Sequence, residues 1–321
     1  MPELPEVTAL AQALTERAAG MVVVRVDVAA ISALKTFDPP VSALAGAEVL
    51  GFSRLGKHLI LDAVDTNGEP LFLVLHLSRG GWVRWRDDPP KAPPGLGRRG
   101  GGGGAGSALA LRVLLAAPEA PMTPVACLDV TEAGTQKRLA AHVVRDPLQV
   151  PMVARLGPDP LDPAFDAAAL GAILADAGRS QLKGVLRDQS RIAGIGNAYS
   201  DEILHVAHLS PFAPASGLSD EARTALLAAI RDTLSRAVLA AVATDPVRLK
   251  AEKKAGMAVH SSRPVRPKNF VMVILPWGSS IRMWFQTSRR SGTAPRHAAD
   301  RQSRCRAASA CRRPARPRRG R

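Results

Sequence analysis

Alternating hydrophobic and polar positions dominate the first 145 residues of the chain. Residues 21–28 place the four even-numbered valines on one face and Arg25 and Asp27 on the other, which predicts a half-buried strand. Similar runs follow at 47–52, 58–62, 71–77, 82–86, 108–115, 125–130 and 138–144. Successive short strands separated by turn residues indicate an antiparallel β-sandwich or barrel.

A helical pattern precedes the first strand. Apolar residues from Val7 to Leu14 recur at i, i+3, i+4 and i+7, and Pro5 suits a first helical turn. We expect this helix to pack on the sheet and to hold the chain terminus in place. Once Met1 is removed, Pro2 carries a free secondary amine that can attack an aldehyde carbon, and Glu3 lies beside it. An ordinary frayed terminus explains these residues, taken alone, at least as well.

A Gly- and Pro-rich segment at 87–107 interrupts the strands. Such a composition cannot bury enough apolar surface to become ordered. We interpret it as a long flexible loop between two strands of one domain, in which Arg98 and Arg99 are solvated charges.

The pattern becomes helical from about Pro151. Helices are predicted at 166–175, 180–186 and 219–242, and Ser219 is a good N-cap for the last. Between the second and third, Gly194 and Gly196 flank one apolar residue and precede a helical run. This turn can present backbone N–H groups to a phosphate. A plain turn between helices is the better interpretation of a lone Gly-x-Gly.

Length and composition narrow the class of protein. The 321 residues are 46% hydrophobic, which allows two domains with real cores. No apolar run approaches the roughly 18 residues of a membrane span, and the acidic start does not resemble a signal peptide. Cysteines occur three times, at Cys127, Cys305 and Cys311, too few for a disulfide framework. We therefore expect a cytoplasmic protein with no membrane partner.

The net charge of +15 suggests a nucleic-acid partner, but its distribution limits that inference. Sixteen Arg and Lys residues and one acid, Asp300, lie from Met257 to the end. The remaining 27 basic and 27 acidic residues cancel over 1–256. DNA binding by the folded part must therefore rest on particular residues and not on overall charge.

Four segments together resemble the formamidopyrimidine-DNA glycosylase and endonuclease VIII (Fpg/Nei) family. Residues 1–7 are similar to its Pro-Glu-Leu-Pro-Glu-Val terminus, and 189–202 resemble its helix-two-turns-helix motif. Residues 54–59 resemble the segment that carries its β-domain lysine, here Lys57, and 76–78 match its His-Leu-Gly/Ser segment. Several motifs in the family's order make a chance match improbable.

The predicted fold class is α+β, with three parts. An N-terminal helix and an antiparallel β-sandwich occupy 1–145, and a helix-two-turns-helix DNA-binding domain occupies 151–256. A basic irregular tail at 257–321 stands where the family has a zinc finger. The resemblance covers roughly residues 1–256.

The resemblance implies a base-excision repair DNA glycosylase with AP lyase activity. Pro2 would attack C1′ of a damaged nucleotide flipped out of duplex DNA and form a Schiff base. Glu3 would act as general acid, with its carboxyl kept partly protonated by its surroundings. Lys57 would pair with a phosphate beside the lesion, and Asn197 would contact the same backbone region. β-elimination, either alone or followed by δ-elimination, would then cleave the strand. The expected partner is damaged double-stranded DNA, bound by a monomer close to the nucleoid.

Other implied positions allow more than one interpretation. Glu6 would help to hold the terminus in the DNA-binding site, and Gly196 is implied as a DNA-binding residue. His76 is either a core histidine or a DNA contact. Lys57 alone could also be a surface lysine at a strand start. Arg79 replaces the Met with which purine-excising members fill the gap left by the flipped base, so the preferred lesion stays open. Further DNA contacts are implied at Gln136, Lys137 and Arg138.

The C-terminal tail departs from the family. The family's zinc finger uses two Cys-x-x-Cys pairs, whereas this tail contains only Cys305 and Cys311, and His260 and His297 have unsuitable spacing. We therefore expect no zinc and no other cofactor. The abrupt change of composition near Gly256 suggests the hypothesis of a frameshift near codon 260. The alternative function is a catalytically weak DNA-binding remnant, because a lost phosphate clamp can misplace the lesion.

Overall fold

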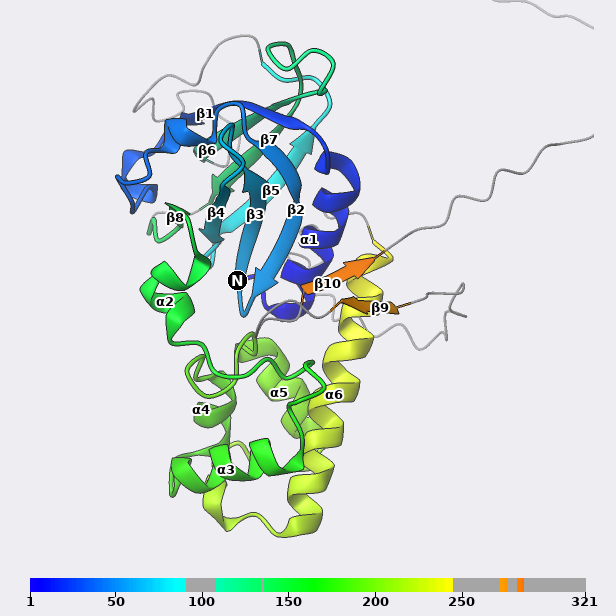
Figure 1. Ribbon diagram of the computed structural model, residues 1–321. Helices are drawn as coiled ribbons and strands as arrows, with labels where there is room; N and C mark the ends of the chain where they lie inside the picture. The colour runs from blue at the N-terminus through cyan, green and yellow to red at the C-terminus, as the bar shows by residue number, and fades with distance from the viewer. Residues whose placement is uncertain (91–107, 134–135, 245–271, 276–281, 286–321) are drawn as a thin grey trace, which may run out of the picture. The chain divides into compact units, whose positions relative to one another are not determined.

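The computed structural model describes residues 1–90, 108–133, 136–244, 272–275 and 282–285 (Figure 1). The chain divides into two units, Met1–Arg266 and Pro267–Arg321. The first unit holds a β-sandwich with a helix along it and a group of helices below, while the second contributes one short hairpin.

Eight antiparallel strands in the order β5-β7-β6-β1-β2-β3-β4-β8 form the sandwich. β1 and β2 share a single residue pair, Val22 with Glu48, so the sheet divides there into two four-stranded layers. The strands are β1 (Val22–Val28), β2 (Glu48–Leu55), β3 (His58–Val64), β4 (Pro70–His76), β5 (Gly81–Arg86), β6 (Ala108–Ala116), β7 (Pro124–Glu132) and β8 (Ala140–Val144). Every predicted strand is present, and the predicted sandwich is confirmed.

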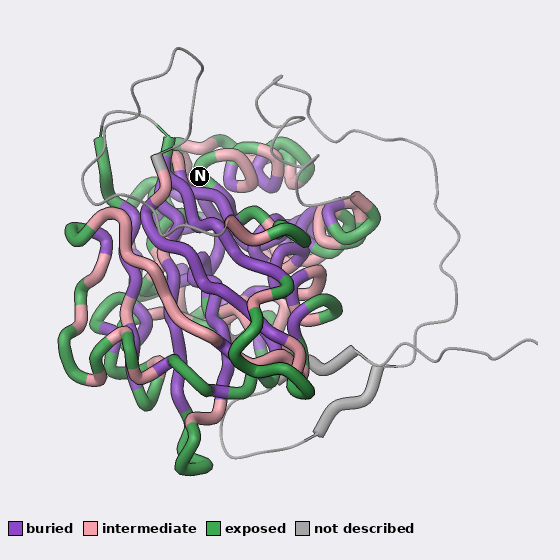
Figure 2. The backbone as a smooth tube through the Cα atoms, turned by 90° about the horizontal axis from the view of Figure 1, so that it is seen from above, coloured by how far each residue is buried: buried purple, intermediate pink, exposed green. Residues whose placement is uncertain are grey.

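One apolar core lies between the two layers, and helix α1 (Leu4–Ala18) covers its open side. Leu61 of β3 and Val113 of β6 come from different layers and are each 1% exposed. Leu10 of α1 joins the same cluster and is fully buried. Figure 2 shows the buried segments gathered inside the molecule, with exposed segments around them. Burial of apolar surface between the layers and α1 is therefore what holds the terminal helix in place.

The predicted face of β1 holds after a bulge, where Val26 packs against the core, but not before it. Val23 is the valine that is fully buried, whereas the even-numbered valines of this strand are only half-buried. The register of β1 against β6 shifts between Val23 and Arg25, where a β-bulge adds one residue. Because side chains alternate along a strand, one extra residue reverses the faces on its two sides.

A second core holds the helices together below the sandwich. Leu4 of α1 belongs to this core, with Leu226 and Ile230 of the long helix, and all three are fully buried. Ser219 accepts a hydrogen bond from the backbone N–H of Ala222 at 3.3 Å, as its prediction as an N-cap requires. The helices are α2 (Pro151–Ala154), α3 (Ala167–Ala177), α4 (Leu182–Arg187), α5 (Asn197–Val206) and α6 (Asp220–Val242), with 3₁₀ turns η1 (Ile31–Ala33), η2 (Val41–Leu44), η3 (Pro147–Gln149) and η4 (Ala215–Gly217).

The second unit shows two short strands, β9 (Met272–Leu275) and β10 (Arg282–Phe285), which pair antiparallel. The prediction of a wholly irregular tail is therefore wrong at these residues, because two apolar runs of β-forming residues interrupt the Arg- and Pro-rich composition. The predicted flexible loop falls outside the described residues at 91–107, as does most of the tail. No helix within the described ranges is long and apolar enough to cross a membrane.

Candidate active site at the chain terminus

The carboxylate of Glu3 lies on the N-terminus of helix α5. Its two oxygens accept hydrogen bonds from the backbone N–H groups of Gly196 at 2.8 Å, Ala198 at 3.1 Å and Tyr199 at 3.3 Å. These are free donors at the start of a helix, where the peptide dipoles favour a negative charge. This turn, which could also suit a phosphate, therefore holds a carboxylate of the chain itself. Glu3 is 4% exposed.

Both glycines of the turn are required by close packing against the terminus. A Cβ on Gly196 would lie 2.4 Å from Cδ of Glu3, and one on Gly194 would lie 2.7 Å from Cδ1 of Leu4. Gly194 also has φ +91°, which L-residues rarely adopt. Its carbonyl accepts the N–H of Leu4 at 3.0 Å. The Gly-x-Gly turn is thus shaped to receive the first residues of the chain.

Glu6 fixes the terminus from the other side. Its Oε2 accepts the backbone N–H of Glu3 at 2.8 Å, which completes a capping box on α1. Its Oε1 accepts the hydroxyl of Tyr199 at 3.2 Å. Burial and the nearby Glu6 raise the pKa of Tyr199, so its hydroxyl stays protonated and available as a donor. Tyr199 therefore holds Glu3 through its backbone and Glu6 through its side chain.

Pro2 is buried between these contacts, while Met1 beside it is 39% exposed. The structure therefore gives the terminus a rigid setting, and the interpretation as a frayed end is wrong. The Glu3 carboxylate accepts hydrogen bonds from backbone N–H groups, and its role as a proton donor stays a prediction.

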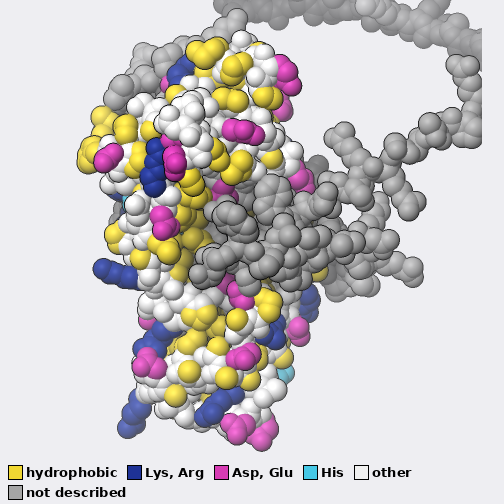
Figure 3. All heavy atoms as spheres, in the orientation of Figure 1, with side chains coloured by type: hydrophobic (Ala, Val, Ile, Leu, Met, Phe, Trp, Pro, Cys, Tyr) yellow, Lys and Arg dark blue, Asp and Glu magenta, His cyan; other side chains and the backbone are white. Residues whose placement is uncertain are grey.

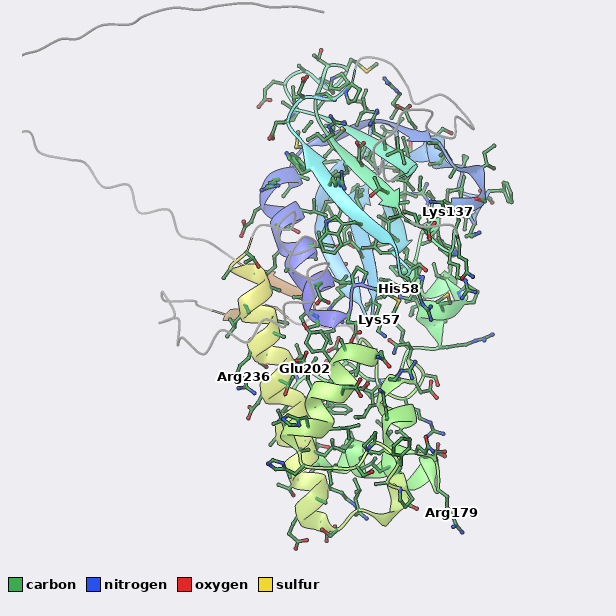
Figure 4. All side chains as sticks on the ribbon, turned by 180° about the vertical axis from the view of Figure 1, so that it is seen from behind. Lys57, His58, Lys137, Arg179, Glu202 and Arg236 are labelled. Atoms are coloured by element: carbon green, nitrogen blue, oxygen red, sulfur yellow. The ribbon has the colours of Figure 1, made fainter. Side chains whose placement is uncertain are left out.

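Lys57 occupies the two-residue turn that joins β2 to β3, after Gly56 with φ +55°. Figure 4 shows Lys57 and His58 at the end of the sandwich that faces the helices. Lys57 is only 7% exposed, so the interpretation as an ordinary surface lysine is wrong. A Cβ on Gly56 would contact Leu156 at 3.1 Å and Ala193 at 3.6 Å, which shows how closely this turn meets the helical part.

Three histidines lie on one sheet face next to Lys57. His58 on β3 is paired with His76 on β4, and their ring centroids are 5.1 Å apart. His142 on β8 is paired with Val74 on β4. Burial, His76 and His142 lower the pKa of His58 to about 4, against the opposing effect of the Leu55 carbonyl. Burial and Lys57 lower the pKa of His76, and burial and Lys35 lower that of His142. His76 is thus a half-buried neutral histidine at the edge of the Lys57 turn, which fits both of its predicted interpretations.

Arg79 and Arg138 are exposed on two neighbouring loops. The carbonyl of Gly80 accepts a hydrogen bond from the N–H of Ala133 at 2.9 Å. A Cβ added to Gly80 would lie 2.1 Å from the Ala133 carbonyl oxygen, so the two loops are in contact. The carboxylate of Glu132 accepts the backbone N–H of Arg138 at 2.7 Å. The exposed residues that share this second loop with Arg138 are Gln136 and Lys137.

The structure brings Pro2, Glu3, Glu6 and Gly196 into direct contact or adjacency and places Asn197 exposed at the first turn of α5. Sequence reasoning missed two further residues of the site. These are Tyr199, which the sequence shows only within a helical run, and Arg54, which it shows only within a motif. The signals that could have identified them are a lone tyrosine at N3 of a helix and an arginine before a Gly-Lys turn.

Charge on the described surface is mixed. Figure 3 shows Lys and Arg side chains interspersed with Asp and Glu on the visible face, as expected for residues 1–256 with no net charge. No group of three or more His, Cys, Asp or Glu among the described residues could hold a metal ion. Cys305 and Cys311 lie outside them and are two short of the family's four, so zinc does not fit this donor set.

Comparisons with known proteins agree with this geometry. Residues 1–98 match the family model of the formamidopyrimidine-DNA glycosylase N-terminal domain, and 156–246 match that of its H2TH domain. A formamidopyrimidine-DNA glycosylase from Moorella thermoacetica is 34% identical over 247 residues, which are 74% of this chain and 78% of that protein. An uncharacterized formamidopyrimidine-DNA glycosylase-like protein from Mycobacterium tuberculosis is 49% identical over 111 residues, which are 35% of this chain and 68% of the relative.

Solved structures show the same fold. The MutM (Fpg) protein from Thermus thermophilus matches with a TM-score of 0.58 at 28% identity, over 75% of this chain and 77% of that one. The Fpg of Lactococcus lactis, solved with DNA that contains an abasic site, matches with a TM-score of 0.59 at 23% identity, over 74% of this chain and 78% of the other. The chain therefore belongs to the formamidopyrimidine-DNA glycosylase family, whose members are DNA-binding glycosylases of base-excision repair.

Proposed function

We propose that this glycosylase is bifunctional, with the AP lyase activity carried by the N-terminal proline. The supporting observation is the setting of Pro2, which is buried beside a carboxylate fixed by three backbone N–H groups. A nucleophile that must meet one carbon atom needs such a fixed position, because a misplacement of about 1 Å can cost roughly a hundredfold in rate.

The chemistry begins after Met1 is removed. The Pro2 nitrogen attacks C1′ of the flipped nucleotide, the bond from C1′ to the base breaks, and the base leaves with a proton. Opening of the sugar ring, with a proton supplied by Glu3, gives an iminium ion between Pro2 and C1′. The iminium acidifies the C2′ protons, so loss of one expels the 3′ phosphate, and δ-elimination then expels the 5′ phosphate. Lys57 and Asn197 are assigned to the phosphates beside the lesion.

Borohydride trapping on a duplex with an abasic site tests the proposal. Reduction of the iminium gives a stable protein–DNA adduct in the native chain, and Pro2→Gly, whose amine is primary and less constrained, reduces its yield. Glu3→Gln also reduces it, since Gln cannot supply the proton. Arg145→Gln, which removes an exposed arginine paired with Asp65 on the sandwich, serves as a control for general damage.

A second candidate function is a DNA-binding remnant without useful catalysis. The observation that favours it is the loss of the finger cysteines from the tail. Salt-sensitive binding to the abasic duplex with no trapped adduct establishes this second function and excludes the first. Excision assays on oxidised purines and oxidised pyrimidines then identify the lesion. We further propose action as a monomer in the cytoplasm, near the nucleoid and without a metal cofactor, which the cysteine usage supports.

A further inference from the structure

Arg54 is a buried arginine whose side chain joins three separate segments. Its Nε donates to the hydroxyl of Thr8 on α1 at 3.0 Å, and one terminal nitrogen donates to the carbonyl of Gly56 at 3.0 Å. The other terminal nitrogen forms a 2.6 Å ion pair with Asp159, between α2 and α3. The Arg54 side chain is 8% exposed, and Nε and both terminal nitrogens already have acceptors within the protein. Only a guanidinium offers donors in three fixed directions from one position.

The first two contacts fix the turn that carries Lys57. Gly56 immediately precedes Lys57, and the Arg54 hydrogen bond holds its peptide carbonyl. The hydroxyl of Thr8 passes the restraint on to α1, because it donates to the carbonyl of Leu4 at 2.8 Å. The lysine turn is therefore tied to the helix that begins beside Pro2.

The third contact ties the same turn to the helical part. Asp159 follows Gly157, whose N–H donates to the Gln189 carbonyl at 2.8 Å, and Pro158, whose carbonyl accepts the N–H of Ala193 at 3.0 Å. A Cβ on Gly157 would lie 2.5 Å from the Arg191 carbonyl oxygen, so this segment is pressed onto the turn that leads to Gly196. The Asp159 segment and the Glu3 carboxylate thus rest on one continuous turn.

We infer that Arg54 is a positioning residue that sets the Lys57 ammonium in register with the N-terminus of α5, through the Gly56 carbonyl and Asp159. The inference rests on the proposed contact of Lys57 with a DNA phosphate. Because the guanidinium of Arg54 is engaged by Thr8, Gly56 and Asp159, its effect on DNA binding passes through Lys57.

The salt dependence of DNA binding provides the test, because each phosphate contact contributes about 0.9 to the slope of log K against log salt concentration on duplex DNA. The probe is a duplex with a tetrahydrofuran abasic-site analogue, which measures binding without chemistry. The slope is negative, and we expect Lys57→Gln and Arg54→Gln each to reduce its magnitude by about 0.9. The double variant should show the same slope as either single one, since both remove one contact. Arg145→Gln, which removes an equal charge from another arginine that binds a carboxylate and a carbonyl, should leave the slope unchanged.

Several results overturn the inference. These are a native slope in Arg54→Gln, additive losses in the double variant, or a native slope in Lys57→Gln. Should Arg54→Gln fail to fold, Asp159→Asn keeps the arginine and removes only the ion pair, and it must then reduce the magnitude of the slope. A native slope in a folded Asp159→Asn likewise refutes the role. The absence of a trapped adduct in the native chain refutes the lyase proposal instead and leaves these binding comparisons valid.

Discussion

At the scale of single residues, the Tyr199 hydroxyl is the most specific support of the terminus, because it joins helix α5 to the Glu6 carboxylate. Tyr199→Phe keeps the ring and its packing but leaves one Glu6 oxygen without this donor. We expect a loss of about 1 kcal/mol in the free energy of unfolding and a several-fold slower trapping reaction. Chemical denaturation and single-turnover borohydride trapping measure the two effects.

The matched control for Tyr199→Phe is Thr224→Val, which removes an exposed hydroxyl that donates to the Asp220 carbonyl of α6. This control should leave the trapping rate unchanged. A native trapping rate in folded Tyr199→Phe shows that Glu6 holds the terminus without help from the tyrosine.

His58 makes stability depend on pH. Its pKa is lowered to about 4 in the folded protein, from an ordinary value of 6.5, mainly by burial. Between these values the unfolded chain binds more protons than the folded one, so stability rises with pH across this window and falls on acidification. The shift corresponds to about 3 kcal/mol lost between pH 6.5 and 4. His58→Gln should flatten the pH dependence of the unfolding free energy in this range.

The control for the pH experiment is His205→Gln on α5, since His205 is exposed. This variant should show the same pH dependence of the unfolding free energy as the native chain. An unchanged acid-side slope in His58→Gln assigns the pH dependence to His76 and His142, whose pKa values are also lowered by burial.

At the scale of elements, the joint between the terminus and α5 depends on a missing side chain at Gly196. Gly196→Ala places a methyl group 2.4 Å from Cδ of Glu3, so the carboxylate must leave the helix N-terminus. We expect destabilisation of about 1–3 kcal/mol and loss of most trapped adduct. Thermal unfolding and the trapping yield are the measurements.

Gly171→Ala in α3 is the matched control, since a Cβ there meets nothing within 4 Å. Ala is favoured over Gly in a helix interior by about 1 kcal/mol, so this control should be neutral or stabilising. Normal trapping by Gly196→Ala means that the Glu3 contact with α5 is dispensable.

The sequence predicted the elements better than their contacts. Alternation and helical spacing located every strand of the sandwich and helices α1, α3, α4 and α6, because these patterns follow from which face meets the core. The pattern gave the wrong face for β1 only before Arg25, since the bulge between Val23 and Arg25 depends on pairing with β6 and leaves no mark in composition. The chain terminus was predicted as a site, but the acceptor role of Glu3 depends on Gly196, 193 positions later, which no local pattern reveals.

At the scale of the whole molecule, charge and fold are separated along the sequence. Residues 1–256 carry no net charge, and the segment from Met257 carries all of the +15. A chain that ends at Gly256 should therefore lose much of its salt-dependent affinity for undamaged duplex DNA, because that affinity comes from phosphate neutralisation. Binding isotherms at several salt concentrations test this, with trapping on an abasic duplex measured in parallel. Equal non-specific binding by the shortened chain means that the tail does not act on DNA.

The hydrogen bonds between the N-terminus of α5 and Glu3 also set an order of events during synthesis. If the Pro2 amine is the nucleophile, an aminopeptidase must cut the bond between Met1 and Pro2, and Pro2 is buried once the fold is complete. The groups that bury it are made late, since Gly196 follows Glu3 by 193 residues. At about 5–20 residues per second, a ribosome needs on the order of 10–40 s to cover that distance. Maturation of the nucleophile therefore has a natural interval on the ribosome, before the terminus is enclosed by the helix that later holds it.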